Sequence, residues 1–469
     1  MITNDTIAAI SSGLTESGIG IVRLSGPDSY RIAERIFRRP DGRPADLREP
    51  NRVQYGYISD VSRETSEAET LDEVLLINLK APHSYTGEDT IEIDCHGGVR
   101  MMKRVLEVLL QSGARLADPG EFTRRAFLNG RIDLAQAEAV IDVINSKNDY
   151  ALKASVSQLK GSISGKIREL REKLLMESAY IEAALDDPEH YSLDEWRPGF
   201  EITIKRLRED VRKLIQSFRY GKLVKEGINT VIIGKPNAGK SSLLNAILGE
   251  DRAIVTMVPG TTRDTITETI SLGGLSLNLM DTAGIRETDD LVESIGVRRA
   301  YESAAKADLV LCVVDASSPL DAADMEILGY IRTQPVRTLF LFNKSDLHTV
   351  VKAEEILESM PEDKRESLTI SALTRQGITE LTAKIEEMFS LGDISYNDEV
   401  TVSSVRHLQL LKKADESLNS VEESISNSMP EDFYTVDLMD AYGALGQIIG
   451  EQVDDDLVNE IFNRFCMGK

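Results

Sequence analysis

The stretch that most restricts how this chain can fold is a glycine-rich loop, Gly234-Lys-Pro-Asn-Ala-Gly-Lys-Ser241. Residues 230–233 before it form a short apolar run typical of a strand, and residues 241–248 after it favour a helix. Gly234 and Gly239 let the backbone curl until successive N–H groups face one oxyanion, and the helix dipole adds positive potential there. This strand, turn and helix predict a P-loop that binds a nucleoside triphosphate.

Several side chains of this loop are expected to contact the nucleotide. Lys240 would reach the β- and γ-phosphates, and the Ser241 hydroxyl would hold Mg²⁺. The predicted nucleotide contacts of the loop and the helix start are Asn237, Ala238, Gly239, Lys240, Ser241 and Ser242. The alternative is a chance glycine-rich turn, and the flanking strand and helix argue against it.

Three later motifs indicate which triphosphate binds. In Asp281-Thr-Ala-Gly284, the aspartate would bind Mg²⁺ through water and the last glycine N–H would meet the γ-phosphate. Asn343-Lys-Ser-Asp346 ends a buried run, and a carboxylate there accepts hydrogen bonds from the N1–H and 2-amino group of guanine. Ser371-Ala-Leu373 is expected to back the guanine. The order of these motifs predicts a GTPase. Its further GTP contacts are expected at Asp281, Thr282, Ala283, Gly284, Asn343, Lys344, Asp346, Ser371, Ala372 and Leu373.

The segment between the P-loop and Asp281 contains the expected first switch, Gly260-Thr-Thr-Arg-Asp264. Within it, Thr262 is the expected ligand of Mg²⁺ and the γ-phosphate. Ile285 stands where Ras-like GTPases have a glutamine that orients the attacking water. Because isoleucine cannot orient water, we expect the acidic segment 287–293 to supply that group.

The positive charge that stabilises the transition state has two possible sources. Arg263 and Arg286 are candidates for an arginine finger. A bound cation is the alternative, since Asn237 offers a side-chain carbonyl beside the phosphates that suits the oxygen shell of a monovalent ion.

The spacing of apolar residues divides the chain into regions. Residues 1–130 alternate strand-like and helical runs, which predicts an α+β domain. Residues 131–220 and 392–469 are helical, and neither region can bury its apolar stripe alone. The predicted fold class is therefore an α+β N-terminal domain, an all-α helical bundle domain and an α/β P-loop (Ras-like) GTPase domain at residues 221–391, inserted into the bundle.

Local signals mark some helix ends. Ser29 is expected to be the N-cap of a helix. Asp133 and Gln136 have the spacing of a capping box. Pro188 and Pro198 are expected to interrupt the helical run between them.

The N-terminal region contains four candidates for ligand binding: Arg23, Glu92, His96 and Arg131. Alternation places Glu92 and Asp94 on one face of a strand, where two carboxylates are either a binding site or a solvated surface. His96 precedes two glycines and has no partner at metal-site spacing, so it is expected to shape a turn.

Composition limits the class of protein and its partners. The chain has 469 residues, a formal charge of −24 and three cysteines far apart in sequence. These cysteines, and the absence of an apolar run or signal peptide, predict a cytoplasmic protein that does not bind membranes. A contact with nucleic acid needs a local basic patch or a basic partner; alternatively, the acidity simply maintains solubility.

Motifs at both ends of the chain resemble those of the bacterial tRNA-modification GTPase family MnmE, also called TrmE. The resemblance rests on Ser84-Tyr-Thr-Gly-Glu-Asp89, His96-Gly-Gly98, Pro119-Gly-Glu-Phe122, Arg125-Ala-Phe-Leu-Asn-Gly130, Asp133-Leu-Ala-Gln-Ala-Glu138, Gly260-Thr-Thr-Arg-Asp264 and Phe465-Cys-Met-Gly-Lys469. It implies that the region 1–130 forms a homodimer and binds 5,10-methylenetetrahydrofolate or 5-formyltetrahydrofolate. Arg23, Glu92, Arg131 and Lys469 would line that site.

The resemblance also assigns roles in GTP hydrolysis. Asn237, Thr256, Thr261 and the main-chain carbonyl of Val258 would supply oxygens to a K⁺ ion that acts as the missing finger. This ion would tie hydrolysis to pairing of two G domains, and Glu293 would position the water. The candidate catalytic residues are Glu293, Thr262, Lys240, Arg286 and Cys466. For Cys466, a catalytic thiol and a merely exposed or packed thiol remain open.

The reaction implied is addition of an aminomethyl-type group, carboxymethylaminomethyl or aminomethyl, at C5 of the wobble uridine of certain tRNAs. The implied partner is the FAD- and NADH-dependent protein MnmG (GidA), in a heterotetramer. Two other functions remain open: a GTPase switch in ribosome assembly, and a one-carbon transferase whose G domain is only regulatory. The acidic helices and the absence of a basic tail argue against the first.

Overall fold

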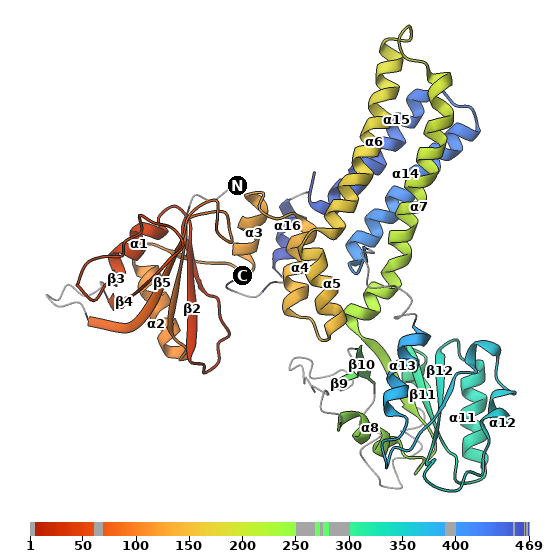
Figure 1. Ribbon diagram of the computed structural model, residues 1–469. Coiled ribbons are helices and arrows are strands. Elements are labelled where there is room, and N and C mark those ends of the chain that lie inside the picture. Colours follow the sequence, from red (N-terminus) through yellow and green to blue (C-terminus); the bar gives the residue numbers. More distant parts are fainter. Residues whose placement is uncertain are drawn as a thin grey trace. The chain divides into compact units, whose positions relative to one another are not determined.

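The computed structural model (Figure 1) describes residues 5–60, 69–249, 268–272, 275–280, 301–389, 400–453, 455–463, 465 and 468. The chain forms two compact units, which are described separately. The first comprises Met1–Ile141, Gln158–Tyr191 and Tyr434–Lys469, and the second comprises Asp142–Ser157 and Ser192–Phe433. The predicted domain limits remain a prediction, because each unit contains part of the helical region.

Among the described residues of the first unit, the central element is a seven-stranded sheet with the order β3-β4-β5-β6-β2-β1-β7. Its strands are β1 (Ile7–Ile10), β2 (Ile19–Ser25), β3 (Phe37–Arg38), β4 (Arg52–Asp60), β5 (Glu69–Leu79), β6 (Thr90–His96) and β7 (Arg115–Leu116). Strands β1 and β7 are parallel, whereas β2 is antiparallel to both β1 and β6. This register places Arg23 directly opposite Glu92, and Ile21 opposite Asp94.

One face of this sheet is covered by α1 (Ser29–Ile36) and α2 (Val99–Gln111), as Figure 1 shows. Strand alternation directs residues such as Ile93 to this face, where they form a core with Met102 and other apolar side chains of the two helices. The opposite face carries the charged residues of the candidate N-terminal site.

Two of the expected helix starts have different outcomes. Asp28 occupies the N-cap of α1, so the expected N-cap role of Ser29 is wrong. Ser29 is the first helical residue, and its hydroxyl lies within 2.8 Å of two backbone carbonyl oxygens. The capping box at α4 (Leu134–Ile144) is confirmed: the Gln136 N–H donates to Asp133 Oδ1 at 2.9 Å, and the Asp133 N–H donates to Gln136 Oε1 at 3.0 Å.

Helices make up the rest of the first unit. They are α3 (Glu121–Leu128), α4, α6 (Ser162–Asp186), most of α15 (Glu431–Ile449) and α16 (Asp455–Phe462). Ala126 of α3 packs with Phe462 of α16 and with Phe465 just beyond it. The C-terminal helix is thereby held against the N-terminal region.

Two long helices of the second unit, α7 (Leu193–Glu226) and α14 (Val405–Ser426), pack side by side. Pro188 precedes α7 as expected, but Pro198 lies inside it, so the expected break at Pro198 is wrong. The proline falls in the first two turns, where it removes at most one helical hydrogen bond. The buried residues that follow it, beginning with Phe200, keep the helix in place.

Within the described residues, the second unit also contains a six-stranded sheet with the order β13-β12-β11-β8-β10-β9. The strands are β8 (Ile228–Ile233), β9 (Glu268–Leu272), β10 (Leu275–Leu279), β11 (Leu309–Asp315), β12 (Arg337–Asn343) and β13 (Ser367–Thr369). Neighbouring strands are parallel except in the β9–β10 hairpin. Parallel strands align their carboxyl ends at one edge, where ligands bind in such sheets.

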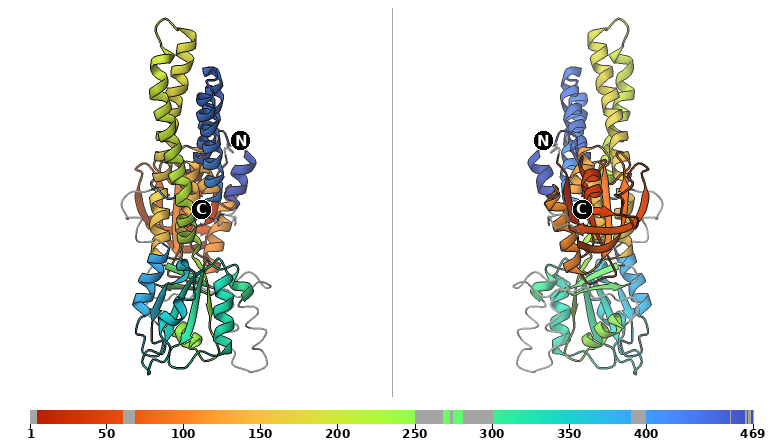
Figure 2. Two further views of the ribbon diagram at one scale, coloured as in Figure 1. Left: turned by 90° about the vertical axis from the view of Figure 1, so that its right-hand side faces the viewer. Right: turned by 90° about the vertical axis from the view of Figure 1, so that its left-hand side faces the viewer.

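Helices cover both faces of the parallel sheet, and two apolar cores separate them from it. The helices are α5 (Asp149–Leu159), which begins in this unit, α8 (Lys240–Leu248), α11 (Ala322–Thr333), α12 (Ala353–Leu357) and α13 (Ile378–Met388). Figure 2 shows α11 (teal) and α13 (blue) on opposite sides of the strands. The α+β, all-α and P-loop α/β parts confirm the predicted fold class. In the described part of the chain, every helix is too short or too polar to cross a membrane.

Candidate functional site

The P-loop turns from the end of β8 into α8 as predicted. A Cβ at Gly234 would overlap the carbonyl oxygen of Val313 on β11, and one at Gly239 would overlap the Asn343 side chain. Gly239 has φ 101° and Asn237 has φ 61°, so the loop uses the left-handed region twice. Glycine is therefore required at both positions by close packing, and at Gly239 by backbone conformation as well.

The lysine of the P-loop lies where the motif predicts it, at the start of α8. Lys240 begins α8, and its Nζ donates to the carbonyl oxygens of Gly234 at 2.7 Å and Lys235 at 2.9 Å. The Lys240 ammonium group therefore connects the end of the loop to its beginning. Ser241 and Ser242 are exposed on the first turn of α8, whereas Ala238 is buried beneath the loop.

Asn343, at the end of β12, joins the P-loop to the predicted guanine loop. Its Nδ2 donates to the Ala238 carbonyl at 2.9 Å, and its Oδ1 accepts from the Ala372 N–H at 2.9 Å. Its side chain is 2% exposed. The three motifs that lie far apart in sequence are thus connected through one amide.

The next residues present a carboxylate to the solvent. Asp346 is exposed, and its Oδ1 accepts a hydrogen bond from Ser371 Oγ at 2.6 Å. Ser371 is itself held by an N–H···O bond of 3.0 Å to Gln376. Leu373 is exposed beside this loop. The carboxylate is therefore held in a fixed orientation in which it can accept the two adjacent donors of guanine.

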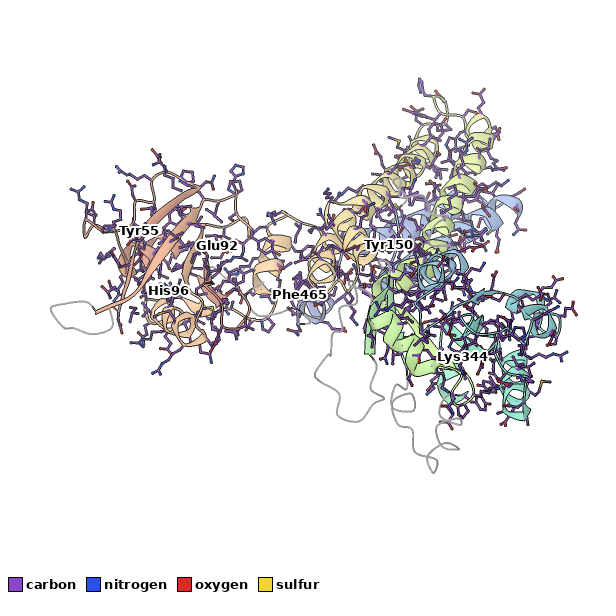
Figure 3. All side chains as sticks on the ribbon, turned by 60° about the horizontal axis from the view of Figure 1, so that its bottom comes forward. Tyr55, Glu92, His96, Tyr150, Lys344 and Phe465 are labelled. Atoms are coloured by element: carbon purple, nitrogen blue, oxygen red, sulfur yellow. The ribbon has the colours of Figure 1, made fainter. Side chains whose placement is uncertain are left out.

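Asp315, at the end of β11, contacts the predicted guanine loop, which the sequence did not indicate. It forms a 2.6 Å ion pair with Lys344, whose backbone has φ 67°. Lys344 is labelled in Figure 3. Burial alone would raise the pKa of Asp315, but hydrogen bonds from Lys344 and Ser317 outweigh it and lower the pKa. The only sequence signal was an aspartate at the end of an apolar run.

Other predicted G-domain and C-terminal residues lie outside the described residues. These are Thr256, Val258, Thr261, Thr262, Arg263, Asp281, Thr282, Ala283, Gly284, Ile285, Arg286, Glu293, Cys466 and Lys469. Their roles stay predictions.

On the N-terminal sheet, Arg23 and Glu92 form an ion pair of 2.8 Å across β2 and β6. Both side chains are mostly buried, with 15% and 19% exposed. The Arg23 guanidinium lies 5.3 Å from the ring centre of Tyr85 and 5.6 Å from that of Phe122, and Arg131 lies 5.1 Å from Tyr85. The structure therefore brings the three predicted residues Arg23, Glu92 and Arg131 together around aromatic rings.

Two neighbours on β6 differ from the sequence-based expectation. Among the described residues, the buried Oδ1 atom of Asp94 has no hydrogen-bond partner. Burial and, to a lesser extent, the charge of Glu92 raise the pKa of Asp94. His96 pairs through Nδ1 with Asp72, at 2.6 Å, and this hydrogen bond raises the pKa of His96. The partner was not evident from sequence because Asp72 lies on β5. Figure 3 marks Glu92 and His96 on the sheet.

The C-terminal segment contacts the N-terminal sheet through Gly468, at the end of β1. Ser11 Oγ donates to the Gly468 carbonyl at 3.0 Å. Gly468 has φ 90°, and a Cβ added to it would overlap the Ile10 carbonyl oxygen. Because Ile10 pairs with Val22, Gly468 lies next to the strand that carries Arg23. Phe465 anchors the same segment in the core described above.

Comparisons with known proteins agree over the full length. A family model described as "GTP-binding protein TrmE N-terminus" matches residues 6–131, and one described as "MnmE helical domain" matches residues 134–466. The chain is 52% identical to the tRNA modification GTPase MnmE of Lachnoclostridium phytofermentans, over 99% of each chain. It is 46% identical to that of Clostridioides difficile, over 100% of each chain.

A solved structure of Era from Aquifex aeolicus bound to GDP and AlF4− is 28% identical, covering 40% of this chain and 66% of that one. Its TM-score of 0.28 is too low to support an inference. The full-length identity to curated relatives and the two family models are decisive, and they agree with the P-loop and guanine motifs. The chain is a GTP-binding enzyme and belongs to the MnmE (TrmE) family of tRNA modification GTPases.

Proposed function

We propose that this protein hydrolyses GTP in order to support the addition of an aminomethyl-type group to C5 of the wobble uridine of certain tRNAs. The group is carboxymethylaminomethyl or aminomethyl, and the partner is MnmG (GidA), an FAD- and NADH-dependent protein that joins it in a heterotetramer. The observation that carries this proposal is the 52% identity to a tRNA modification GTPase over 99% of both chains. A basic surface on the partner would compensate for the charge of −24.

In the G domain, Asp346 would select guanine and Lys240 would bind the β- and γ-phosphates. The fixed Asp346 carboxylate and the position of Lys240 at the start of α8 support these roles. Mg²⁺ would be held by Ser241 and Thr262, and the exposed Ser241 hydroxyl beside Lys240 fits that ligand. The ion would neutralise charge that develops on the phosphates.

A K⁺ ion would be held by Asn237, Thr256, Thr261 and the carbonyl of Val258. Asn237 fits because it is exposed in the loop and has a left-handed backbone conformation. The ion supplies the positive charge of an arginine finger, a role for which Arg286 is the alternative. Glu293 would orient the attacking water, and two G domains would pair during hydrolysis.

The N-terminal sheet would bind 5,10-methylenetetrahydrofolate or 5-formyltetrahydrofolate. Glu92 offers an acceptor for ring N–H groups, and Arg23 and Arg131 offer charge-assisted donors next to Tyr85. Lys469 would add a cation to the same site. This role is supported by the contact of Gly468, the preceding residue, with Ser11 just after β1, the strand next to β2. Cys466 is the candidate thiol for this chemistry.

The same sheet face supports a homodimer. Several large apolar residues on it are exposed, including Ile19 (63%), Val53 (59%), Tyr55 (45%) and Leu75 (41%). Tyr55 and Leu75 are directly opposed on β4 and β5, so the apolar surface is continuous there. Exposed patches of this kind mark protein interfaces.

Reconstitution tests the proposal. The purified protein would be mixed with MnmG, unmodified tRNA, 5,10-methylenetetrahydrofolate, an amine donor and GTP, and the tRNA nucleosides would be analysed by mass spectrometry. We expect a C5-modified uridine that disappears when GTP or the folate is omitted, and faster GTP turnover in K⁺ than in Na⁺ at equal ionic strength. Turnover of GTP without any modified uridine would contradict the modification role, and equal rates in the two salts would contradict the K⁺ site.

A further inference from the structure

The P-loop contains a second lysine, Lys235, whose ammonium group is directed to α11. Its side chain is only 11% exposed, and Nζ lies 2.6 Å from Asp324 Oδ2 and 3.1 Å from Asp321 Oδ2. Asp324 is 5% exposed, so the shorter of these ion pairs is buried. Lys235 is thus fixed on a helix that is remote from the P-loop in sequence.

The two aspartates are themselves fixed by the helix that they begin. Asp321 Oδ1 accepts the N–H groups of Ala323 and Asp324, and Asp324 Oδ2 accepts the N–H of Asp321 at 3.1 Å, which completes a capping box. Burial alone would lower the pKa of Lys235, but the hydrogen bonds that its ammonium group donates to Asp324 and Asp321 outweigh this effect and raise the pKa. The ammonium group is therefore charged and has preformed partners.

The backbone of the same residue holds the nucleotide-binding lysine. The carbonyl oxygen of Lys235 accepts a hydrogen bond from Lys240 Nζ at 2.9 Å. Asn237, the proposed K⁺ ligand, lies two residues further on, in the left-handed conformation. A shift of Lys235 relative to α11 would consequently move the partner of Lys240 and the start of the turn that presents Asn237.

We propose that Lys235 and Asp324 are a positioning pair for GTP hydrolysis: their ion pair anchors the P-loop on α11 and so holds Lys240 at the phosphates. Lys235 acts through the loop and not on the phosphates themselves. The assignment rests on the GTPase activity of the family and is independent of the folate, K⁺ and tRNA proposals. A displacement of about 1 Å in a catalytic group costs roughly 100-fold in rate, so a loose loop is expected to be visible in kinetics.

The test compares Lys235→Met, Asp324→Asn, the double variant and Lys235→Arg in the full-length protein. GTP hydrolysis is measured per nucleotide-binding site, with sites counted by stoichiometric binding of fluorescent GDP well below the unfolding temperature. Lys306→Met is the matched control, because Lys306 is an exposed lysine of the same domain. Asp324→Asn keeps an oxygen for the Asp321 N–H and so preserves the cap.

We expect Lys235→Met and Asp324→Asn each to lower kcat/KM per site by about 10- to 100-fold. The double variant should lose no more than the worse single variant, because the Lys235–Asp324 ion pair is already absent from each single variant. Lys235→Arg should restore most of the rate, and Lys306→Met should equal wild type. A reduced number of sites with unchanged kcat/KM per site would show a merely structural role and overturn the proposal. Losses that multiply in the double variant would also overturn it.

Discussion

Replacing Asn343 with alanine removes the amide that joins the P-loop to the guanine loop. The change breaks two hydrogen bonds of 2.9 Å, one to the Ala238 carbonyl and one from the Ala372 N–H. Both partner groups belong to buried residues: Ala238 is 0% exposed and Ala372 is 6% exposed. The variant therefore leaves two buried backbone groups without partners.

The magnitude follows from these two groups. A buried polar group left unsatisfied costs about 1–2 kcal/mol in a loop that relaxes partly, which gives about 2–4 kcal/mol for the pair. The bound nucleotide requires both loops in place, so we expect most of this cost in nucleotide affinity. That corresponds to a loss of roughly 30- to 1,000-fold.

Equilibrium titration with fluorescent GDP measures this loss. The control is Asn419→Ala, which removes a half-buried asparagine whose amide donates a solvent-exposed hydrogen bond to Glu423 on α14. We expect the control to bind GDP as wild type does. A dissociation constant for Asn343→Ala within about threefold of wild type would refute the argument, because that loss is smaller than one unsatisfied group.

Three further changes test other parts of the molecule. Gly468→Ala should release the C-terminal segment, because φ 90° is unfavourable for alanine and its Cβ would overlap the Ile10 carbonyl. We expect faster digestion by carboxypeptidase and weaker binding of 5-formyltetrahydrofolate. Unchanged values of both would contradict the prediction. The pKa of His96, measured by NMR, should lie above its ordinary value and should fall when Asp72 is replaced with asparagine. Because the folded-state pKa is raised, the His96–Asp72 pair stabilises the fold fully below the unfolded pKa of about 6.5. This stabilisation is lost as the pH rises through the folded-state pKa. The same His96 pKa in both proteins would refute the ion pair. Glu293→Ala should bind GTP but hydrolyse it slowly, and unchanged turnover would remove its proposed role.

Local sequence signals predicted local structure well. The P-loop was predictable because its glycines, its lysine and the start of α8 lie within a few residues of each other, and packing against Val313 and Asn343 then demands those glycines. The Asp133 capping box was predictable for the same reason. The prediction for Ser29 failed because its hydroxyl donates instead to the Gly26 and Asp89 carbonyls, and the helix begins at Ser29 itself.

Pairings across strands were not predictable to the same degree. Alternation put Glu92 and Asp94 on one face, but the register of β2 with β6 was needed to show that Arg23 neutralises only Glu92. The partners of His96 and Lys344 come from other strands, so no spacing in the sequence indicates them. Such contacts depend on strand order, which a single sequence specifies only through the whole core.

The contact of Gly468 with the end of β1 has a consequence for synthesis of the protein. The residues of β1 and β2 precede the G domain in the chain, and those around Gly468 follow it. The contact between Gly468 and Ser11 can therefore form only after the G domain has been synthesised. A chain truncated after the G domain would lack α14, which packs along α7, and also the segment around Gly468 that contacts β1. Such a truncation would therefore leave apolar residues of α7 uncovered as well as removing the contact next to β2.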